Sequence, residues 1–370
     1  MTTADARETR VPHTVIYVGP ESTAGGIGHY SDVFVEALRD QIDEVIAIRH
    51  PGPGSDSVAE LRKRRREIHR RIQEPGRVVV HSEISGGSVE SFWPTAFLEH
   101  AHPGLRNSVT VHDPPGLVWL PARTRLLARS RVASHALHYP TRPLIRSLER
   151  RAARDRSLFG LTRIGARSLA ARYPRADVHH VPHFVLDRPV ITPVAERPRA
   201  VGIFGLVYRG KGFEHIERIR AELDPSVGLR IAGRGTESLP SMPGVEVLGG
   251  LDGAELDNFF ASVRALLVPY GQRTPYGDVF PASGVVAHAI GYLTPVVSTA
   301  HGALSEMAED GGAVVVEAEG PSVAPALSRA ATELIDDSDA LERLATELRA
   351  LRDERSPRKV VEGFVEVWSR

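Results

Sequence analysis

Short apolar segments that alternate with segments of helical periodicity constrain the fold of this chain most strongly. In the first half the apolar segments are residues 15–19, 44–49, 77–81 and 108–112. The pattern restarts at residue 200, with apolar segments at 200–205, 228–233, 245–250, 265–270, 294–299 and 313–317. Alternation of buried strands with helices is typical of parallel sheets joined by helical crossovers. The fold class is therefore predicted to be α/β, with doubly wound sheets.

The chain is too long for one hydrophobic core. At 370 residues it favours two domains. Residues 183–198 contain three prolines and no periodicity, which is typical of an interdomain segment. We therefore expect an N-terminal domain over 1–185, a linker over 186–198, a C-terminal domain over 199–356 and a final helix over 357–370. The apolar side chains between Val360 and Trp368 require that helix to pack on another element.

The composition narrows the class of protein. The chain has no cysteine, which excludes a disulfide framework, a thiol nucleophile and a zinc–thiolate site. Its polar N-terminus and interrupted apolar stretches lead us to expect a cytoplasmic protein. Residues 1–190 carry 28 Lys and Arg against 20 Asp and Glu, whereas residues 191–370 carry 18 against 26. We expect the basic half, with its arginine-rich helical segment from His135, to meet an anionic partner such as the inner face of a membrane; ordinary solvated helices are the alternative.

Two glycine-containing loops at strand ends present backbone amides and cationic side chains. Gly25 and Gly26 precede a segment with helical spacing, so their amide N–H groups form a candidate anion site. Lys211 lies between two glycines after the strand at 200–205, and we expect it to open a helix that continues to residue 223. The positive end of a helix disfavours a cation unless an anion is bound there. Lys211 and Arg209 are therefore predicted to contact a phosphate, a surface lysine being the alternative.

A third loop supplies a further helix N-terminus. The segment from Asp278 ends in Ser283 and Gly284 before an apolar helix, whose first N–H groups would suit a phosphate. Two cations and two helix N-termini at strand ends predict a diphosphate pocket in a cleft between the two domains. The chain contains neither GxGxxG nor GxxxxGK[ST], so dinucleotide binding and P-loop hydrolysis lose their usual support.

The order and spacing of these motifs resemble the retaining glycosyltransferases of family 4. The matching fragments are GGIGHYS, TVHD (Thr110 to Asp113), VPHF, FGLVYRGKG, IAGRG, AHAIGYLTPVVST and HGALSE, and together they cover nearly the whole chain. The resemblance implies a GT-B fold, in which two Rossmann-like domains face each other across a cleft and the C-terminal helix packs back on the N-terminal domain. It also implies metal-independent transfer of a hexosyl group, with retention, from a nucleotide diphosphate sugar. A UDP-sugar is favoured over GDP- and dTDP-sugars.

The resemblance further implies roles for individual residues. Lys211 would contact the donor diphosphate, and Arg209 would replace an arginine of the family whose position Leu206 occupies. His112 would lie against the transferred sugar, although a histidine paired locally at a strand end is the alternative. Asp278 would approach the sugar hydroxyls or the reaction centre. The implied donor-binding residues are Gly25, Gly26, Gly205, Gly233, Gly249, Gly250, Ser283 and Gly284, with the turn at 249–250 beside the nucleobase.

One departure from the family leaves other functions open. The E-x7-E pair of the family is Asp278 and Val286 here, and valine cannot accept hydrogen bonds from ribose hydroxyls. The main alternative is therefore a non-catalytic protein of this fold that binds a nucleotide or sugar, or serves as the scaffold of a partner enzyme. Sugar-nucleotide epimerisation or phosphorolysis on a similar fold is a second alternative.

The sequence is less informative about metals and acceptors. The histidines at 179, 180 and 183 have a spacing that could ligate a metal, but they lie where a strand runs into the linker, and we expect no metal site. A glycan, a glycolipid and a small molecule all remain open as the acceptor, and nucleic acid is not expected.

Overall fold

The computed structural model describes residues 11–73, 75–86, 88–188, 192–272 and 277–370. The chain divides into two compact units. Unit 1 comprises Met1–Pro182, Phe280–Ala282 and Pro357–Arg370, and unit 2 comprises His183–Val279 and Ser283–Ser356. The polar N-terminus over 1–10 and residues 189–191 of the expected linker lie outside the described residues.

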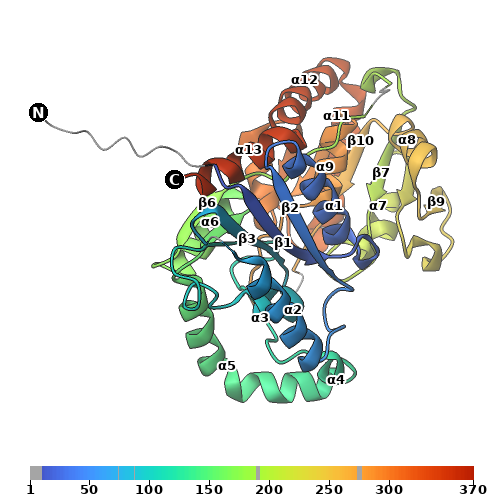
Figure 1. Ribbon diagram of the computed structural model, residues 1–370. Helices are drawn as coiled ribbons and strands as arrows, with labels where there is room; N and C mark the ends of the chain where they lie inside the picture. The colour runs from blue at the N-terminus through green and yellow to red at the C-terminus, as the bar shows by residue number, and fades with distance from the viewer. Residues whose placement is uncertain (1–10, 74, 87, 189–191, 273–276) are drawn as a thin grey trace, which may run out of the picture. The chain divides into compact units, whose positions relative to one another are not determined.

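Unit 1 contains a parallel sheet of six strands in the order β2-β1-β3-β4-β5-β6, with helices around it (Figure 1). The strands are β1 (Thr14–Pro20), β2 (Glu44–His50), β3 (Val78–Ile84), β4 (Arg106–Val111), β5 (Ser157–Gly160) and β6 (Asp177–His180). The helices are α1 (Gly26–Arg39), α2 (Val58–Arg71), α3 (Val89–Thr95), α4 (Arg125–Ala128), α5 (Arg131–Ala153), α6 (Arg163–Arg172) and α13 (Pro357–Trp368). Short 3₁₀ turns are η1 (Ser22–Ala24) and η2 (Pro75–Arg77).

The C-terminal helix α13 packs in unit 1, beside α1, as expected (Figure 1). Its Phe364 is fully buried and lies edge-on to Phe34 of α1, with ring centroids 4.9 Å apart. Phe364 also contacts Phe159 of β5 at 4.3 Å, and Trp368 Nε1 donates a hydrogen bond to Ser108 Oγ of β4. The apolar face predicted between Val360 and Trp368 therefore completes the core on one side of the first sheet.

Unit 2 contains a second parallel sheet, in the order β12-β11-β10-β7-β8-β9. The strands are β7 (Ala200–Phe204), β8 (Gly228–Ala232), β9 (Val245–Gly249), β10 (Ala265–Val268), β11 (Val296–Thr299) and β12 (Ala313–Val316). The helices are α7 (Ile216–Glu222), α8 (Gly253–Ala261), α9 (Gly284–Gly291), α10 (Met307–Asp310), α11 (Val323–Asp336) and α12 (Ser338–Glu354). Short 3₁₀ turns are η3 (Val194–Glu196), η4 (Phe213–His215), η5 (Thr236–Ser238), η6 (Gly302–Glu306) and η7 (Gly320–Ser322).

Unit 2 has its own hydrophobic core, to which all the central strands and the helices α7, α8, α9, α11 and α12 contribute. Arg197 anchors the chain just before β7. Its buried guanidinium donates hydrogen bonds to Thr294 Oγ1 at 2.7 Å and to the carbonyl oxygens of Phe260 and Tyr292 at 3.0 and 2.9 Å. Because these acceptors surround the cation, burial of Arg197 is compensated and the end of the interdomain segment is fixed to unit 2.

The two Rossmann-like sheets and all ten strand segments predicted from the sequence are confirmed. Strand β5 was not among the predicted segments. The helix expected from Lys211 to residue 223 is present only over its later part: the start at Lys211 is wrong, because the chain forms a turn there, η4 follows and α7 begins at Ile216. Gly212 adopts φ +77°, which ends any helical path from Lys211. Among the described residues, no helix is long and apolar enough to cross a membrane.

Candidate functional site

In each sheet one predicted loop lies where the winding of the chain reverses. In unit 1 the reversal lies between β1 and β3, and in unit 2 it lies between β7 and β10. Ligands of open α/β sheets bind outside the carboxyl ends of the strands at this point, because the two connections there leave in opposite directions. The Gly25–Gly26 loop follows β1, and Lys211 lies on the loop that follows β7. Both loops therefore occupy the position at which such sheets hold small molecules.

In unit 2, Lys211 is linked through Tyr270 to Ser283. Lys211 Nζ donates a hydrogen bond to the phenolic oxygen of Tyr270 and lies 3.8 Å from the centroid of that ring. Tyr270 Oη lies 3.2 Å from Ser283 Oγ, and Ser283 Oγ in turn accepts a hydrogen bond from the N–H of Val286. Lys211 and Tyr270 follow the two strands that flank the reversal, so the cation lies beside the N-terminus of α9.

Three of the predicted glycines form a row at the carboxyl ends of β7, β8 and β9. The N–H of Gly205 donates to the carbonyl oxygen of Ala232 at 2.9 Å, and the N–H of Gly233 donates to Gly249 at 2.7 Å. Gly233 has φ +127°, and a Cβ there would lie 2.0 Å from the carbonyl oxygen of Gly205. A side chain at Gly233 is therefore excluded, which keeps the backbone open at the end of the sheet.

The turn at Gly249 and Gly250 is held by an acidic side chain that the sequence did not single out. Glu237 accepts hydrogen bonds from the N–H of Gly250 at 2.8 Å and from the N–H of Gly235 at 2.7 Å. Hydrogen bonds from its own backbone and from the N–H groups of Gly250 and Gly235 lower the pKa of Glu237. An ionised Glu237 thus ties the ends of β8 and β9 together.

The remaining predicted residues of unit 2 differ in their surroundings. Arg209 is exposed on the same turn as Lys211, and Leu206 is also exposed there. Asp278 is exposed in the connection between β10 and α9, next to residues 273–276, which lie outside the described residues. Val286 is 9% exposed and belongs to the core of unit 2. The side chain at that position therefore supports α9 from inside and offers no polar group.

In unit 1, His112 follows β4 and is paired with a buried carboxylate. His112 Nε2 lies 2.7 Å from Glu83 Oε2, and the other carboxylate oxygen lies 3.2 Å from His81 Nε2. Glu83 is 1% exposed. Burial raises the pKa of Glu83, but hydrogen bonds from His112 and His81 outweigh that effect and lower it to about 2. Glu83 is therefore an anion that orients the imidazole of His112.

Helix α1 connects the first glycine loop to this histidine. Gly25 adopts φ +92° directly before α1, and Gly26 is the first residue of the helix. One turn later, Tyr30 lies edge-on to the ring of His112, with centroids 5.0 Å apart. A Cβ at Gly28 would lie 2.0 Å from the carbonyl oxygen of Glu21, so this third glycine fixes the approach of the loop to α1. The structure thus brings Gly25, Gly26 and His112 to one end of the first sheet.

Three residues of these clusters were missed from the sequence although a signal existed. Tyr270 is the last residue of the predicted strand segment 265–270 and lies two residues beyond β10, at the carboxyl end of a strand, as Lys211 lies on the loop after β7. His81 and Glu83 are two residues apart in β3 and therefore lie on one face of the sheet. In the part of the chain that the structure describes, no group of three or more His, Asp or Glu side chains is arranged to hold a metal ion.

Comparison with known proteins gives one family and many structures. Residues 203–337 match the family described as glycosyl transferases group 1. That segment contains Gly205, Lys211, Tyr270 and Ser283, and so covers the cluster at the reversal of the second sheet. A search of the curated proteins found no match.

Several solved structures share the fold over 96% of this chain. HepE of Anabaena, solved in complex with UDP and glucose, is 14% identical with a TM-score of 0.65, over 99% of its own chain. A glycosyltransferase from Rickettsia africae is 10% identical with a TM-score of 0.69, and sucrose-phosphate synthase of Thermosynechococcus elongatus is 15% identical with a TM-score of 0.66, each over 98% of its chain. At these identities the likeness shows the fold, which is the GT-B architecture. Together with the family match, it supports a GT-B glycosyltransferase.

Proposed function

We propose that this chain is a retaining hexosyltransferase of the family 4 type, which moves a sugar from a nucleotide diphosphate sugar to an acceptor without a metal. The observation that carries the proposal is the position of Lys211, inside the segment that matches group 1 glycosyl transferases and at the reversal of the second sheet. A UDP-sugar is the favoured donor, because HepE, which shares the fold, was solved with UDP-glucose.

The chemistry follows from the groups at the end of the second sheet. When the bond to the sugar breaks, negative charge develops on the diphosphate, and a fixed cation with helix N–H groups lowers the energy of that state. Lys211 would supply the cation, with Arg209 as a second one. Ser283 caps α9 through Val286, so the first amides of the helix, at Gly284 and Val285, would face the phosphate oxygens.

Residues of both units would act on the sugar, the base and the acceptor. His112 would contact the transferred sugar, held in one orientation by Glu83. Asp278 would approach the sugar hydroxyls, and the Gly249–Gly250 turn would pack against the base. In a retaining transfer without an enzymic nucleophile, the acceptor attacks from the face that the leaving group departs from. A phosphate oxygen of the leaving group then takes the acceptor proton.

The first test measures binding and turnover with the same variants. Purified protein is heated with UDP, GDP, dTDP and ADP and with their common sugars, and the melting temperature is recorded. We expect a rise of several degrees with UDP, abolished in Lys211→Ala and retained in the matched control Lys359→Ala, which removes an exposed lysine from α13. Donor turnover should fall about 100-fold or more in Lys211→Ala, because one preorganised charge is lost.

Two outcomes would change the assignment. If no nucleotide raises the melting temperature, the donor site is absent and the proposal fails. If UDP binds but neither transfer nor hydrolysis of any UDP-sugar is detected, the chain is a non-catalytic nucleotide-binding protein of this fold. The apolar Val286, in place of a glutamate, favours that alternative. Where turnover occurs, NMR of the anomeric proton distinguishes retention from inversion, and activity in EDTA tests metal independence.

A further inference from the structure

Helices α4 and α5 of unit 1 carry an unusual set of exposed apolar side chains. Leu126 is 76% exposed, Val132 80%, Leu137 42% and Leu144 71%. Elsewhere in the described residues, no exposed large apolar side chain exceeds 55%. Burying such side chains is normally favourable, so three that remain at least 71% exposed within nineteen residues indicate a surface that is covered in use.

The same segment is strongly cationic. Residues 121–154 contain nine arginines and a single acidic residue, Glu149. Glu149 is buried and paired with Arg172, at 2.8 Å, so it does not offset the arginines at the surface. Arg129, Arg146 and Arg151 are exposed. We call the exposed side chains of Leu126, Val132, Leu137, Leu144, Arg129, Arg146 and Arg151 the α4–α5 surface.

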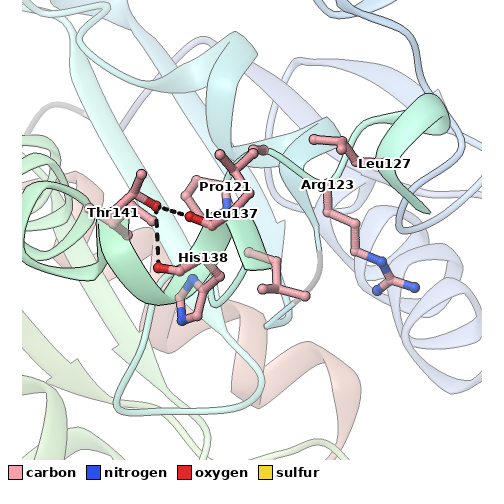
Figure 2. Close-up of a pocket in the computed structure, with 9 residues that line it drawn as sticks. Pro121, Arg123, Leu127, Leu137, His138 and Thr141 are labelled. Atoms are coloured by element: carbon pink, nitrogen blue, oxygen red, sulfur yellow. Dashed lines mark hydrogen bonds between the residues drawn. The ribbon is translucent and has the colours of Figure 1, made fainter. Parts of the chain in front are cut away.

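The shape of α5 presents this surface outward within unit 1. Pro140 and Pro143 lie inside the helix, where they remove backbone donors and bend it. Thr141 Oγ1 donates hydrogen bonds to the carbonyl oxygens of Leu137 and His138, as Figure 2 shows, which satisfies acceptors at the bend. Figure 1 shows α5 bent, with α4 and the first part of α5 lying away from the strands of the first sheet.

A hollow beside α5 does not explain the exposed side chains. It is lined by residues of the preceding loop, α4 and α5, among them Pro121, Leu127 and Leu137 (Figure 2). Leu126, Val132 and Leu144 do not line it. These three side chains are therefore not the rim of this hollow, and they fit a broad partner better than a small molecule.

We propose that the α4–α5 surface docks on an anionic lipid membrane. Exposed apolar side chains on a helix rich in arginine fit the boundary between lipid headgroups and acyl chains, where the apolar groups insert and the guanidinium groups meet phosphate. A second copy of the chain fits less well, because a symmetric contact would oppose two identical cationic surfaces. The proposal does not depend on transfer activity, since it concerns a surface apart from the strand-end clusters.

The test measures binding to vesicles of two compositions, phosphatidylcholine alone and equal parts phosphatidylcholine and phosphatidylglycerol. We expect flotation of the protein with the anionic vesicles only, and release as salt is raised, since each arginine near the surface contributes about fivefold to affinity. The variant Leu126→Ser/Val132→Ser/Leu144→Ser and the variant Arg129→Gln/Arg146→Gln/Arg151→Gln should each bind at least 100-fold more weakly. Both sets are exposed, so the melting temperature should not change.

Matched controls decide whether this surface or the general charge of unit 1 is responsible. Arg62→Gln/Arg66→Gln/Arg70→Gln removes three exposed arginines from α2, and Val58→Ser removes an exposed valine from the same helix. Both should bind anionic vesicles like the native protein. Equal loss in the α2 arginine variant would show diffuse electrostatics and overturn the proposal. Absence of binding to anionic vesicles would also overturn the proposal. If sedimentation equilibrium shows a dimer that the leucine and valine substitutions abolish, the partner is a second copy of the chain instead.

Discussion

At the scale of single residues, the buried ion between two imidazoles in unit 1 is the most informative feature. Glu83 spans His112 and His81, and His81 continues the chain of polar contacts to Ser108 Oγ at 2.8 Å. A buried carboxylate requires such partners, because an unpaired charge in the core is costly. Since an ionised Glu83 only accepts hydrogen bonds, it holds the proton of His112 on Nε2 and leaves Nδ1 for a ligand.

Replacing Glu83 by glutamine should therefore affect the role of His112 rather than donor binding. In Glu83→Gln we expect kcat to fall about 10- to 100-fold, with little change in the KM for the donor, because the fixed proton position is lost. ¹⁵N NMR of the His112 ring should show the proton distributed over both nitrogens.

Glu90→Gln is the matched control, since Glu90 is also fully buried in unit 1 and bonds to backbone N–H groups of Ser55 and Asp56 instead. It should leave kcat unchanged. An unaltered tautomer of His112 in Glu83→Gln would show that Glu83 does not position the ring. The NMR measurement decides this even if no sugar acceptor is found.

The site could be predicted from the sequence only where one position carries its own signal. Lys211 and the glycines at strand ends were found because residue type and local sequence suffice. Tyr270 lies 59 positions from Lys211 and Glu83 lies 29 from His112, so these partnerships exist only once the parallel strands are aligned. Strand order, which no local pattern contains, therefore limited prediction of the site.

At the scale of elements, helix α13 shows how the end of the chain stabilises its beginning. Phe364 is fully buried among rings from α1 and β5, so Phe364→Ala would leave a cavity that the surrounding sheet cannot close. The expected loss is about 3–5 kcal/mol in the free energy of unfolding of unit 1. Glu366→Ala, on the exposed side of α13, should change it by no more than about 0.5 kcal/mol.

Denaturant unfolding followed by tryptophan fluorescence would measure this effect, because Trp93, Trp119 and Trp368 all belong to unit 1 and the indole of Trp368 is buried and bonded to Ser108. Equal stability of the two variants would mean that α13 is not docked on unit 1 in solution.

The elements themselves were predictable where the apolar pattern was long enough. Strands 14–20 and 78–84 are fully buried, and the apolar runs Val15–Val18 and Val78–Val80 within them reflect that burial. The error at Lys211 has a different origin. Gly212 takes a left-handed conformation against Pro269, a contact with a strand end 57 positions later, and local helix propensity could not anticipate it.

At the scale of the whole molecule, the groups most sensitive to acid are concentrated in unit 1. His50 is fully buried, and burial together with Arg64 and Arg49 lowers its pKa to about 3. The pKa of His69 is also lowered, by partial burial and by Arg65 and His102. The pKa of Glu83 is about 2 in the folded protein. In unit 2 the carboxylates with lowered pKa, Asp224, Glu237 and Asp336, are near the surface, where solvent screens their interactions.

Unit 1 should therefore lose stability first as the pH falls. Below about pH 6.5 the unfolded chain protonates His50 whereas the folded unit does not, so stability drops by about 1.4 kcal/mol per pH unit toward pH 3. Below about pH 4.5, protonation of Glu83 in the unfolded chain adds to the loss of stability.

Because each unit has a separate core, calorimetry should show two transitions. Only the melting temperature of the unit 1 transition should fall steeply between about pH 7 and pH 5. The unit 2 transition is identified by the rise of its melting temperature with UDP. His50→Gln should flatten the pH dependence of the unit 1 transition. Parallel movement of both transitions, or an unchanged slope in His50→Gln, would refute the assignment of acid sensitivity to this buried histidine.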